Sequence, residues 1–398
     1  MLISQKDHYH KALLIKPDNP KTIFKLAKQY FYEGEFNRAC EYYLKAVQLA
    51  PLCHSYYSGI KGSLLFSRFF DQQVNPHDLE SGINLLQQTT KEQSNFLFTQ
   101  RLLADLLTHQ GKTQEAISYY QAFSYQKTLA SHPELTKQHW NSQQLRKPDF
   151  IVGGFSKCGT TSLHSYLTSH PQVLAATEKE IFFFSHFLDK GNDWYFAHFP
   201  AIQEQNYLTG EASSFYLFWA NPKQILELLP KIKLICLIRN PVDRVISFFY
   251  QLQRIGHQQI SLEESLSLSI KCLQDLSPTD ILNLPNKVLK NYSIPEQLSL
   301  IHMLSGLYIY FVKEWLNIFP KEQFLILKSE DFYHNPATTM KQVHCFLDLP
   351  DYHLKEYRIY NPGSYSCVPE DLRCQLAEFF QPYNQQLEEC LGRSLNWE

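Results

Sequence analysis

The segment from Phe150 to Leu163 reads FIVGGFSKCGTTSL and combines glycines, hydroxyl side chains and a single lysine, Lys157. An apolar strand runs into a short loop, and the helix that follows opens with three hydroxyl residues, Thr160, Thr161 and Ser162. Free backbone N–H groups and the helix dipole favour an anion at such a junction, and Gly159 lets the backbone approach it closely. The segment therefore predicts a phosphate-binding loop.

The position of the lysine separates this loop from the Walker A loop of nucleotide kinases. After Gly154-Phe-Ser-Lys-Cys-Gly159, the position where Walker A carries lysine holds Thr160. Lys157 lies inside the loop, where its ammonium would neutralise the bridging oxygen of a 5′-phosphosulfate as that oxygen departs. Such sulfuryl transfer requires no metal. The motif resembles the 5′-phosphosulfate loop of PAPS-dependent sulfotransferases, which implies donor contacts by Ser156, Lys157, Cys158, Gly159, Thr160, Thr161 and Ser162.

A second phosphate-binding position is predicted where the apolar strand KLICLI, residues 233 to 238, ends. Arg239 follows this strand directly, and Ser247 comes eight residues later in the next helix. Open α/β sheets bind ligands beyond the carboxyl ends of their strands, and arginine offers a fork of donors to phosphate. The spacing is similar to the family's 3′-phosphate motif. For Arg244 we expect a surface ion pair with Asp243 or a neighbour, with ligand contact as the alternative.

The segment TEKEIFFFSHF suggests the general base. Lys179, Glu180, Phe183 and Phe184 resemble the KExxFF context of the heparan-sulfate-type branch, which implies that Glu180 takes the proton of the attacking acceptor. A carboxylate beside apolar aromatic residues can be tuned for that task. The alternative for Glu180 is a solvated carboxylate at a helix cap. His186 is the rival base, because other sulfotransferase branches use a histidine.

The acceptor side is less well specified. Glu211 and Ser213 resemble the family's acceptor-side segment, although a structural role for Glu211 is an equal alternative. Residues 254 to 305 match no known motif and are expected to determine acceptor selectivity. Most of the aromatic residues between 194 and 219 are expected to be core, while some could form a platform for a sugar or aryl acceptor. They are Trp194, Tyr195, Phe196, Phe199, Tyr207, Phe215, Tyr216, Phe218 and Trp219.

A loop near the carboxyl end of the chain is expected to cover the nucleotide. The sequence NPGSYS resembles this loop in the shorter bacterial sulfotransferases, and the resemblance implies donor contacts by Gly363, Ser364 and Tyr365. The lysine-rich version of the animal enzymes is missing here, so the outer nucleotide contacts are left open.

These candidate residues are carried by a predicted α/β domain. FIVGGF (150 to 155), KLICLI (233 to 238) and QFLILK (323 to 328) are short and apolar on both faces, which is typical of buried parallel strands. Helical stretches separate them. We expect residues 146–398 to form a P-loop-like parallel sheet flanked by helices, the sulfotransferase fold, and the resemblance extends over roughly residues 148 to 396.

The first 145 residues are predicted to be entirely helical. Ala12 and Pro17 recur as Ala46 and Pro51, an interval of 34 residues, and residues 5 to 130 resemble tetratricopeptide repeats with a degenerate middle copy. Such repeats stack into a concave face that binds proteins, so residues 1–145 are predicted to be a repeat domain with a protein partner. A plain helical bundle is the alternative.

Composition excludes several other classes of protein. The 398 residues exceed the usual single-domain size, which favours two domains, and the net charge of −2 provides no global field for binding nucleic acid. Nine scattered cysteines without CxxC spacing argue against a disulfide framework or a zinc site. We find neither a signal peptide nor an apolar run long enough for a transmembrane segment, and expect a cytoplasmic protein.

The sequence thus predicts an enzyme that moves the sulfuryl group of PAPS in line to a hydroxyl or amine, on a carbohydrate or glycolipid acceptor. Two other functions stay open. One is an ATP-dependent small-molecule kinase with a variant loop, which would need magnesium. The other is a tetratricopeptide adaptor whose α/β domain has lost activity. The sequence does not identify the acceptor, nor does it separate O- from N-sulfation.

Overall fold

The computed structural model describes residues 5–51, 53–92, 97–254, 260–273, 276–287, 294–360, 362–363 and 368–397. By their contacts these residues form two compact units. Unit 1 comprises Met1–Arg146 together with Asp189–Gln203, and unit 2 comprises Lys147–Leu188 together with Glu204–Glu398. The sequence analysis placed one boundary after residue 145 and gave no sign that residues 189–203 pack with the amino-terminal helices.

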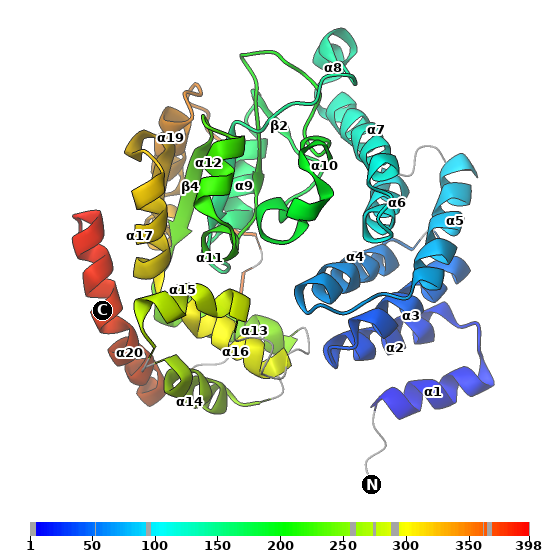
Figure 1. Cartoon of the computed structure of the whole chain (residues 1–398), viewed down its shortest axis with the longest axis horizontal. Coiled ribbons are helices and arrows are strands. Elements are labelled where there is room, and N and C mark those ends of the chain that lie inside the picture. The colour runs from blue at the N-terminus through cyan, green and yellow to red at the C-terminus, as the bar shows by residue number, and fades with distance from the viewer. Residues whose placement is uncertain are drawn as a thin grey trace. The chain divides into compact units, whose positions relative to one another are not determined.

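Unit 1 is built of helices that follow one another along the chain. They are α1 (Gln5–Ile15), α2 (Pro20–Tyr32), α3 (Phe36–Leu49), α4 (His54–Phe69), α5 (Pro76–Glu92), α6 (Leu97–His109), α7 (Thr113–Ser131), α8 (Pro133–His139) and α10 (Asn192–Phe196). Neighbours such as α2 and α3 or α6 and α7 pack side by side (Figure 1). The expected all-helical character of this region is therefore confirmed, whereas its assignment to the tetratricopeptide class stays a prediction.

Local sequence explains the first of these helix pairs. Asn19 caps α2 by accepting hydrogen bonds from the backbone N–H groups of Lys21 and Thr22. Five residues at positions where tetratricopeptide repeats carry small or large apolar side chains are buried, namely Leu26, Ala27, Tyr30, Tyr43 and Ala46. Buried small residues let the two helices approach each other closely.

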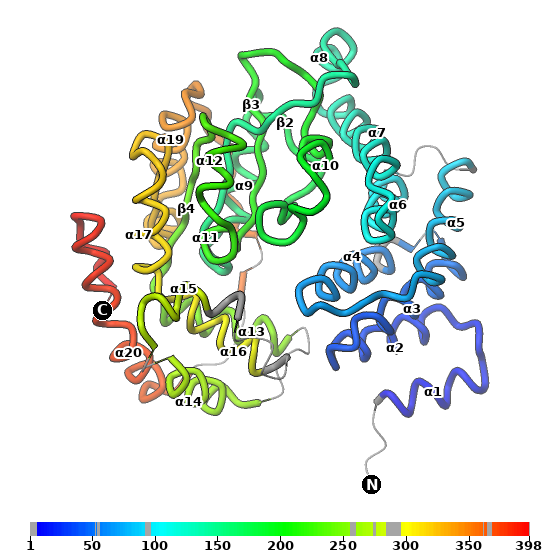
Figure 2. The backbone as a smooth tube through the Cα atoms, viewed as in Figure 1, coloured from blue at the N-terminus to red at the C-terminus, as the bar shows by residue number. Residues whose placement is uncertain are grey.

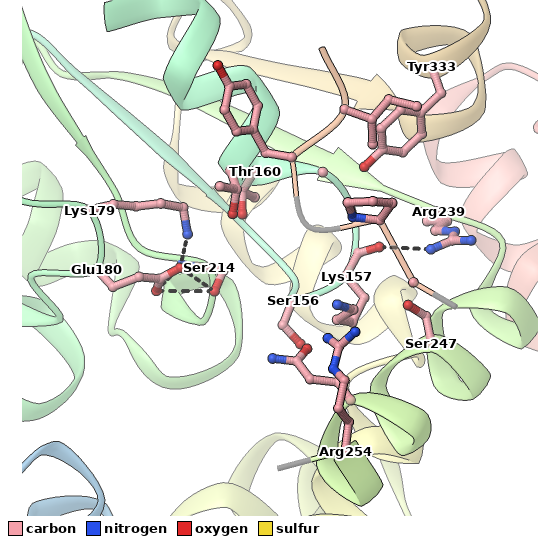
Figure 3. Close-up of a pocket in the computed structure, with 17 residues that line it drawn as sticks. Ser156, Lys157, Thr160, Lys179, Glu180, Ser214, Arg239, Ser247, Arg254 and Tyr333 are labelled. Carbon is pink, nitrogen blue, oxygen red and sulfur yellow. Dashed lines mark hydrogen bonds and ion pairs between the residues drawn. The ribbon is translucent and has the colours of Figure 1, made fainter. Parts of the chain in front are cut away.

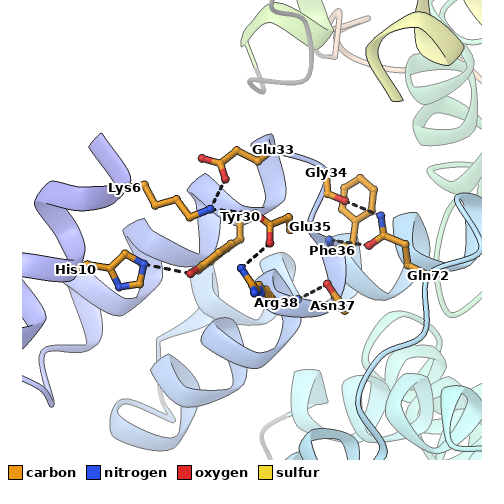
Figure 4. A network of polar contacts seen from close by, with 10 residues as sticks. All are labelled: Lys6, His10, Tyr30, Glu33, Gly34, Glu35, Phe36, Asn37, Arg38 and Gln72. Atoms are coloured by element: carbon orange, nitrogen blue, oxygen red, sulfur yellow. Dashed lines mark hydrogen bonds and ion pairs between the residues drawn. The ribbon is translucent and has the colours of Figure 1, made fainter. Parts of the chain in front are cut away.

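A polar network joins α1 to this pair (Figure 4). Lys6 pairs with Glu33 and Glu35, and its ammonium lies 4.3 Å from the centre of the Tyr30 ring. His10 Nε2 lies 3.1 Å from the hydroxyl of the same tyrosine. The side chain of Gln72, which follows α4, reaches the turn between α2 and α3. There it accepts a hydrogen bond from the backbone N–H of Phe36 and donates one to the carbonyl of Gly34. These bonds fix the end of the helical stack.

Residues 189–203 complete the core of unit 1. The indole N–H of Trp194 donates to Thr108 Oγ1 at 2.9 Å, and the His198 ring lies 4.0 Å, centre to centre, from Tyr120. His198 is fully buried, which holds the pKa of its imidazole well below the ordinary value. The segment is thus an integral part of the helical unit, although it comes from the middle of the sequence.

Unit 2 is a parallel sheet with helices packed against it. Its strands are β1 (Phe150–Gly154), β2 (Val173–Ala175), β3 (Leu208–Ala212), β4 (Lys233–Ile238) and β5 (Phe324–Lys328), in the order β2-β3-β1-β4-β5. All neighbouring strands run parallel. The predicted α/β fold is confirmed. The sequence analysis missed β2 and β3, which are short and, in β3, interrupted by the buried Glu211.

The helices of unit 2 are α9 (Thr160–Thr168), α11 (Tyr216–Trp219), α12 (Pro222–Leu228), α13 (Pro241–Arg254), α14 (Leu262–Leu273), α15 (Pro278–Lys287), α16 (Ile294–Leu304), α17 (Tyr308–Ile318), α18 (Ser329–His334), α19 (Pro336–Phe346) and α20 (Glu370–Leu391). A π-helical turn covers Phe183–Phe187, and short 3-10 turns cover Leu188–Lys190 and Lys321–Gln323. Helix α9 packs on β1, β2 and β3, while α18 and α19 contact β5. Figure 2 shows α9 beside β2 and β3.

The order of the strands places a crevice beside β1. The chain leaves β1 toward β2 on one side, whereas β4 and β5 lie on the other side. Loops that follow β1 and β4 therefore diverge at the carboxyl edge of the sheet, which is where open α/β sheets bind ligands. Among the described residues, none of the helices is both long enough and apolar enough to cross a bilayer.

Candidate active site

The loop after β1 has the backbone geometry that an anion site needs. Gly154 and Gly159 both take left-handed conformations, with φ of 103° and 97°. A Cβ on Gly159 would lie 2.7 Å from the Tyr333 hydroxyl oxygen, so glycine is needed there. Lys157 also has a positive φ, 70°, which is uncommon for a residue with a side chain. The predicted succession of strand, tight loop and helix is confirmed.

A cavity of about 440 Å³ opens at this loop. It is lined by Ser156, Lys157, Gly159, Thr160, Thr161, Lys179, Glu180, Ser214, Arg239, Ser247, Gln251, Arg254, Tyr333, Ile359, Tyr360, Pro362 and Gly363. Residues predicted from three separate motifs thus meet in one place. In Figure 3 the Glu180 cluster lies on one side of the cavity and Arg239 with Ser247 on the other, with Lys157 between them.

Positive charge is concentrated in this cavity. Arg239 extends from the end of β4, and its guanidinium donates to the backbone carbonyl of Lys157 at 3.2 Å. Burial, and after it the nearby guanidinium groups of Arg254 and Arg239, together lower the pKa of the Lys157 ammonium to about 8. Of the described residues that line the cavity, only Glu180 is acidic. The site therefore has the electrostatics of an anion-binding pocket.

The carboxylate of Glu180 is held at the end of β3. Its backbone N–H donates to the carbonyl of Ala212 at 2.8 Å, and its φ of 67° turns the side chain toward Ser214. The backbone N–H of Ser214 donates to Oε2 at 3.1 Å, and the Ser214 hydroxyl donates to Oε1 at 3.0 Å. Lys179 forms an ion pair with the same carboxylate. Glu180 is thus a positioned, partly buried carboxylate that faces the cavity.

His186, the rival candidate for the base, is not among the described residues that line the cavity. Its ring lies against Trp219, with centres 5.1 Å apart, and its Nδ1 contacts the Ser185 hydroxyl at 2.8 Å.

Glu211 and Ser213 are also not among the described residues that line the cavity. Glu211 is buried and accepts hydrogen bonds from the hydroxyls of Ser213 and Tyr216, at 2.6 and 3.0 Å. The geometry therefore favours Glu180 over His186 and gives Glu211 a structural environment.

Comparison with known proteins identifies the family of this chain. The family model described as "Sulfotransferase domain" matches residues 147–361. The chain belongs to the sulfotransferase domain family. A solved relative is the sulfotransferase from Alicyclobacillus acidocaldarius, which is 28% identical, has a TM-score of 0.51, and is matched over 64% of this chain and 99% of its own.

Two curated sulfotransferases illustrate the range of relatives. The membrane-associated sulfotransferase kil1 of Dictyostelium discoideum is 25% identical over 313 residues, which cover 63% of this chain and 66% of kil1. The human bifunctional heparan sulfate N-deacetylase/N-sulfotransferase 3 is 29% identical over 296 residues, or 71% of this chain and 31% of the human protein. This sulfotransferase chain therefore spans about a third of the length of the heparan sulfate relative.

Two residues of the sulfotransferase loop lie outside the cavity. Cys158 is buried, with its Sγ 3.8 Å from the Tyr308 hydroxyl, and its carbonyl accepts from the Ser329 hydroxyl at 2.6 Å. Ser162 is buried and accepts from the backbone N–H of Tyr360 at 3.1 Å. These contacts connect the loop to Tyr308 and Ser329, and the start of α9 to Tyr360. Ser364 and Tyr365, also predicted to contact the donor, lie outside the described residues.

The prediction for Arg244 was wrong. Its side chain is fully buried and donates to the backbone carbonyl of His302, while Asp243 pairs with Arg373 at 2.8 Å. Arg244 does not line the cavity. Burial at this point of α13 is not confined to one face, because the consecutive residues from Arg244 to Phe249 are all buried.

The structure adds cavity residues that sequence reasoning missed. Gln251 and Arg254 follow Ser247 at intervals of four and three residues on α13, so helical spacing alone could have linked them to the predicted phosphate contact. Lys179 is the neighbour of Glu180. Tyr333 follows β5, whose carboxyl end reaches the same edge of the sheet as β1 and β4. Ser214 carries no sequence signal that separates it from the other serines.

Proposed function

We propose that this sulfotransferase transfers the sulfuryl group of PAPS to a hydroxyl or amine of a carbohydrate acceptor. The observation that carries the proposal is the convergence, in one cavity, of the loop bearing Lys157, the pair Arg239 and Ser247, and the carboxylate of Glu180. The proposal accounts for the cluster of cations, because PAPS brings both a phosphosulfate and a 3′-phosphate.

Two groups of residues would bind the donor. Backbone N–H groups of residues 156–161, the amino terminus of α9, and the hydroxyls of Thr160 and Thr161 suit the 5′-phosphate. Arg239 and Ser247 suit the 3′-phosphate. Tyr308 supports this arrangement, since its hydroxyl donates to the backbone carbonyl of Arg239 at 2.9 Å. The residues present therefore fit the two phosphate groups of the donor.

The transfer step is an in-line displacement at sulfur. The acceptor oxygen or nitrogen forms a bond to sulfur as the bond from sulfur to the bridging phosphate oxygen breaks. The electron pair of that bond leaves with PAP, and the Lys157 ammonium stabilises the developing charge on the phosphate oxygen. The proton of the acceptor passes to the Glu180 carboxylate, which Ser214 holds in place. Positioning of both reactants supplies much of the acceleration.

The carbohydrate acceptor is proposed from the relatives and the cavity together. Several relatives bear names that describe them as heparan sulfate N-deacetylase/N-sulfotransferases. Gln251 and Arg254 provide an amide and a guanidinium beside the donor site, and the structure assigns neither a hydrogen bond among the described residues. They are available for an acceptor or for the donor. Residues 254 to 305, expected to set acceptor selectivity, are described only in part.

The test is direct assay of the full chain with PAPS labelled in the sulfuryl group. A panel of glycans, glycolipids, phenols and peptides would serve as acceptors, with PAP formation as the second readout. We expect transfer to a carbohydrate, and we expect Lys157→Ala and Glu180→Gln to abolish it without changing the thermal midpoint. Gln253→Ala is a matched control, since Gln253 is exposed and absent from the cavity lining.

The outcomes that contradict the proposal are equally specific. Retained turnover in Lys157→Ala would exclude the assigned leaving-group role. Magnesium-dependent phosphoryl transfer from ATP would favour a kinase, and a cellular role unchanged by both active-site substitutions would favour an adaptor. A wild-type chain that binds neither PAP nor PAPS would exclude sulfuryl transfer altogether.

For unit 1 we propose tetratricopeptide-like repeats that bind a protein partner, and we propose a cytoplasmic site of action. The buried positions of α2 and α3 at the repeat spacing support the first proposal, and the scattered free cysteines support the second. Affinity capture of a protein partner by the full chain, compared with capture by variants of the unit 1 surface, tests the first proposal. Cell fractionation tests the location, and recovery in a membrane fraction would overturn it.

A further inference from the structure

A second cavity lies within unit 2, away from the chemistry described above. It has a volume of about 530 Å³ and is bounded by α20, the start of α13 and the residues that follow α20. Its lining consists of Asn240, Val242, Ala377, Glu378, Gln381, Asn384, Gln385, Glu388, Ser394, Asn396 and Trp397. None of these described residues also lines the candidate active site. Its size is within the range of ~300–1,000 Å³ that is usual for small-molecule sites.

Hydrogen bonds hold the walls of this second cavity in place. Helix α20 ends at Gly392, whose φ of 65° reverses the chain, and the Glu388 carboxylate then accepts from the Ser394 hydroxyl and the Leu395 backbone N–H. The opposite wall is tied to the same tail through Glu330. One oxygen of Glu330 accepts from the Asn240 backbone N–H at 2.7 Å, and the other accepts from the Trp397 indole at 3.2 Å. The cavity is therefore preformed.

Three carboxamides on α20 line this cavity. Gln381, Asn384 and Gln385 are spaced by three and one residues, which places them on one face of the helix. Gln381 and Gln385 are exposed and Asn384 is half-buried, and among the described residues none of the three side chains has a hydrogen-bonding partner, so their amide groups are accessible to a ligand from solvent. Each carboxamide offers two N–H donors and one acceptor oxygen. The partly exposed Trp397 adds an aromatic surface beside these polar groups.

The charge of the second cavity is opposite in character to that of the active site. The described lining contains no lysine, arginine or histidine, and it includes two carboxylates, of which Glu388 is already engaged by the tail. A nucleotide or a sulfated group would find no cation to pair with. A neutral ligand rich in hydroxyls can exchange donors and acceptors with the amides while an apolar face of its ring contacts Trp397.

From these observations we propose that the second cavity binds a neutral sugar unit of an oligosaccharide. The proposal is independent of the transfer reaction, because the cavity uses none of the residues assigned to it. It gives the chain a separate carbohydrate-binding site, whatever acceptor the active site takes.

Binding of neutral oligosaccharides to the full chain tests this proposal. Maltohexaose, cellohexaose and chitohexaose would be titrated by saturation-transfer NMR and calorimetry. Saturating PAP would occupy the donor site, and the substitutions below distinguish the second cavity from acceptor binding at the active site. We expect at least one of them to bind. We expect Gln381→Ala/Gln385→Ala to weaken that binding by about tenfold or more. Gln386→Ala is the matched control, because Gln386 is an exposed neighbour on the same helix that does not line the cavity.

Three results would overturn the assignment. They are the absence of binding by all three oligosaccharides at millimolar concentration, equal binding by the double variant and the Gln386 variant, and binding of spermine without binding of any sugar. The last would identify the carboxylates as a cation site. Melting curves would check that the double variant is folded, and Trp397→Phe, which keeps an aromatic ring, provides a second variant. Failure of sulfuryl transfer would leave these results unaffected.

Discussion

Lys157 keeps its ammonium in a place that already holds other positive charges. Burial and the neighbouring Arg254 and Arg239 bring its pKa down to about 8, from an ordinary value of about 10.4. The empty site thus disfavours the protonated form that the transfer step needs. An anionic donor reverses this balance, because its charges favour the ammonium. Binding of the donor and protonation of Lys157 should therefore be linked.

The first prediction is that affinity for PAP falls as pH rises above about 8. Between about pH 7 and this pH Lys157 already carries its proton and the phosphates of PAP are fully ionised, so affinity should be nearly constant. Above it the empty site loses the proton that the complex must regain, and affinity should fall by up to about tenfold per pH unit. Calorimetry in two buffers of different ionisation enthalpy would measure the proton uptake. Lys157→Arg should remove the pH dependence, and a wild-type affinity that is equal at pH 7 and 9 would contradict the linkage.

The second prediction concerns Gly159. An alanine there would have to adopt a φ of 97° and place its Cβ 2.7 Å from the Tyr333 hydroxyl oxygen. Backbone strain of this kind costs about 1–3 kcal/mol, so Gly159→Ala should lower the unfolding temperature and weaken PAP binding. Adding Tyr333→Phe removes the closest atom and should restore part of the loss, but not the share that arises from φ. Wild-type PAP affinity in Gly159→Ala would show that the loop tolerates the methyl group.

At the scale of elements, α13 brings a row of polar side chains to the cavity. Ser247, Gln251 and Arg254 share one side of the helix, while Val245 and Phe249 face the core. The row begins near the predicted 3′-phosphate position and extends along the cavity. One helix therefore carries both a residue assigned to the donor and residues that the sequence motifs do not explain.

The third prediction is that Arg254→Gln weakens PAP binding and shifts its pH dependence. Removing this guanidinium should raise the pKa of Lys157 toward its ordinary value, so the decline in affinity should begin at a higher pH. The loss of attraction should weaken binding about two- to fivefold, since an exposed charge contributes at most about 1 kcal/mol. Gln253→Ala should change neither quantity. An unchanged pH profile in Arg254→Gln would mean that the charge of Arg254 does not reach Lys157.

Elements whose sequence follows a simple rule could be predicted. The strands β1, β4 and β5 are apolar on both faces, and the loop after β1 combines glycine, lysine and hydroxyl residues in a recognisable order. By contrast, β3 contains a buried glutamate whose charge is satisfied by Ser213 and Tyr216, so its pattern does not look like a buried strand. Arg244 was misjudged because a buried arginine is rare unless its donors find acceptors, and the His302 carbonyl lies 58 residues away.

The residues of the candidate active site also divide into those that the sequence could predict and those that it could not. Lys157, Arg239, Ser247 and Glu180 were found because each belongs to a local motif. Tyr333, Tyr360 and Ser214 reach the cavity from distant parts of the chain, and only the three-dimensional arrangement brings them together. The positive φ of Lys157 and Glu180 could not be predicted either, because both residues have side chains for which that conformation is unfavourable.

For the whole molecule, the fourth prediction concerns division of the chain into its units. A fragment of residues 147–398 keeps residues 189–203 but loses the helices against which they pack. Trp194, Tyr195 and Phe199, now buried, would be exposed. We expect this fragment to aggregate. Replacing residues 189–203 of the fragment with a glycine-serine linker should restore a monomer with a cooperative unfolding transition and PAP-induced stabilisation.

Size-exclusion chromatography and thermal unfolding would compare the two fragments. If the unmodified fragment is monomeric and as stable as the linker form, then residues 189–203 do not require the helices. Sequence alone could not have suggested this design. The resemblance to sulfotransferases covers residues 148 to 396 without interruption, and it gives no sign that part of that stretch packs with another unit.

The discontinuity of unit 1 also constrains the order in which the chain can fold during synthesis. Domains usually fold as units, the amino-terminal one first. Here Thr108 and Tyr120 contact Trp194 and His198, which are synthesised only after β1 and α9. The sheet is likewise complete only after β4 and β5 have been synthesised. The helical unit therefore cannot complete its core until the first part of unit 2 has been synthesised.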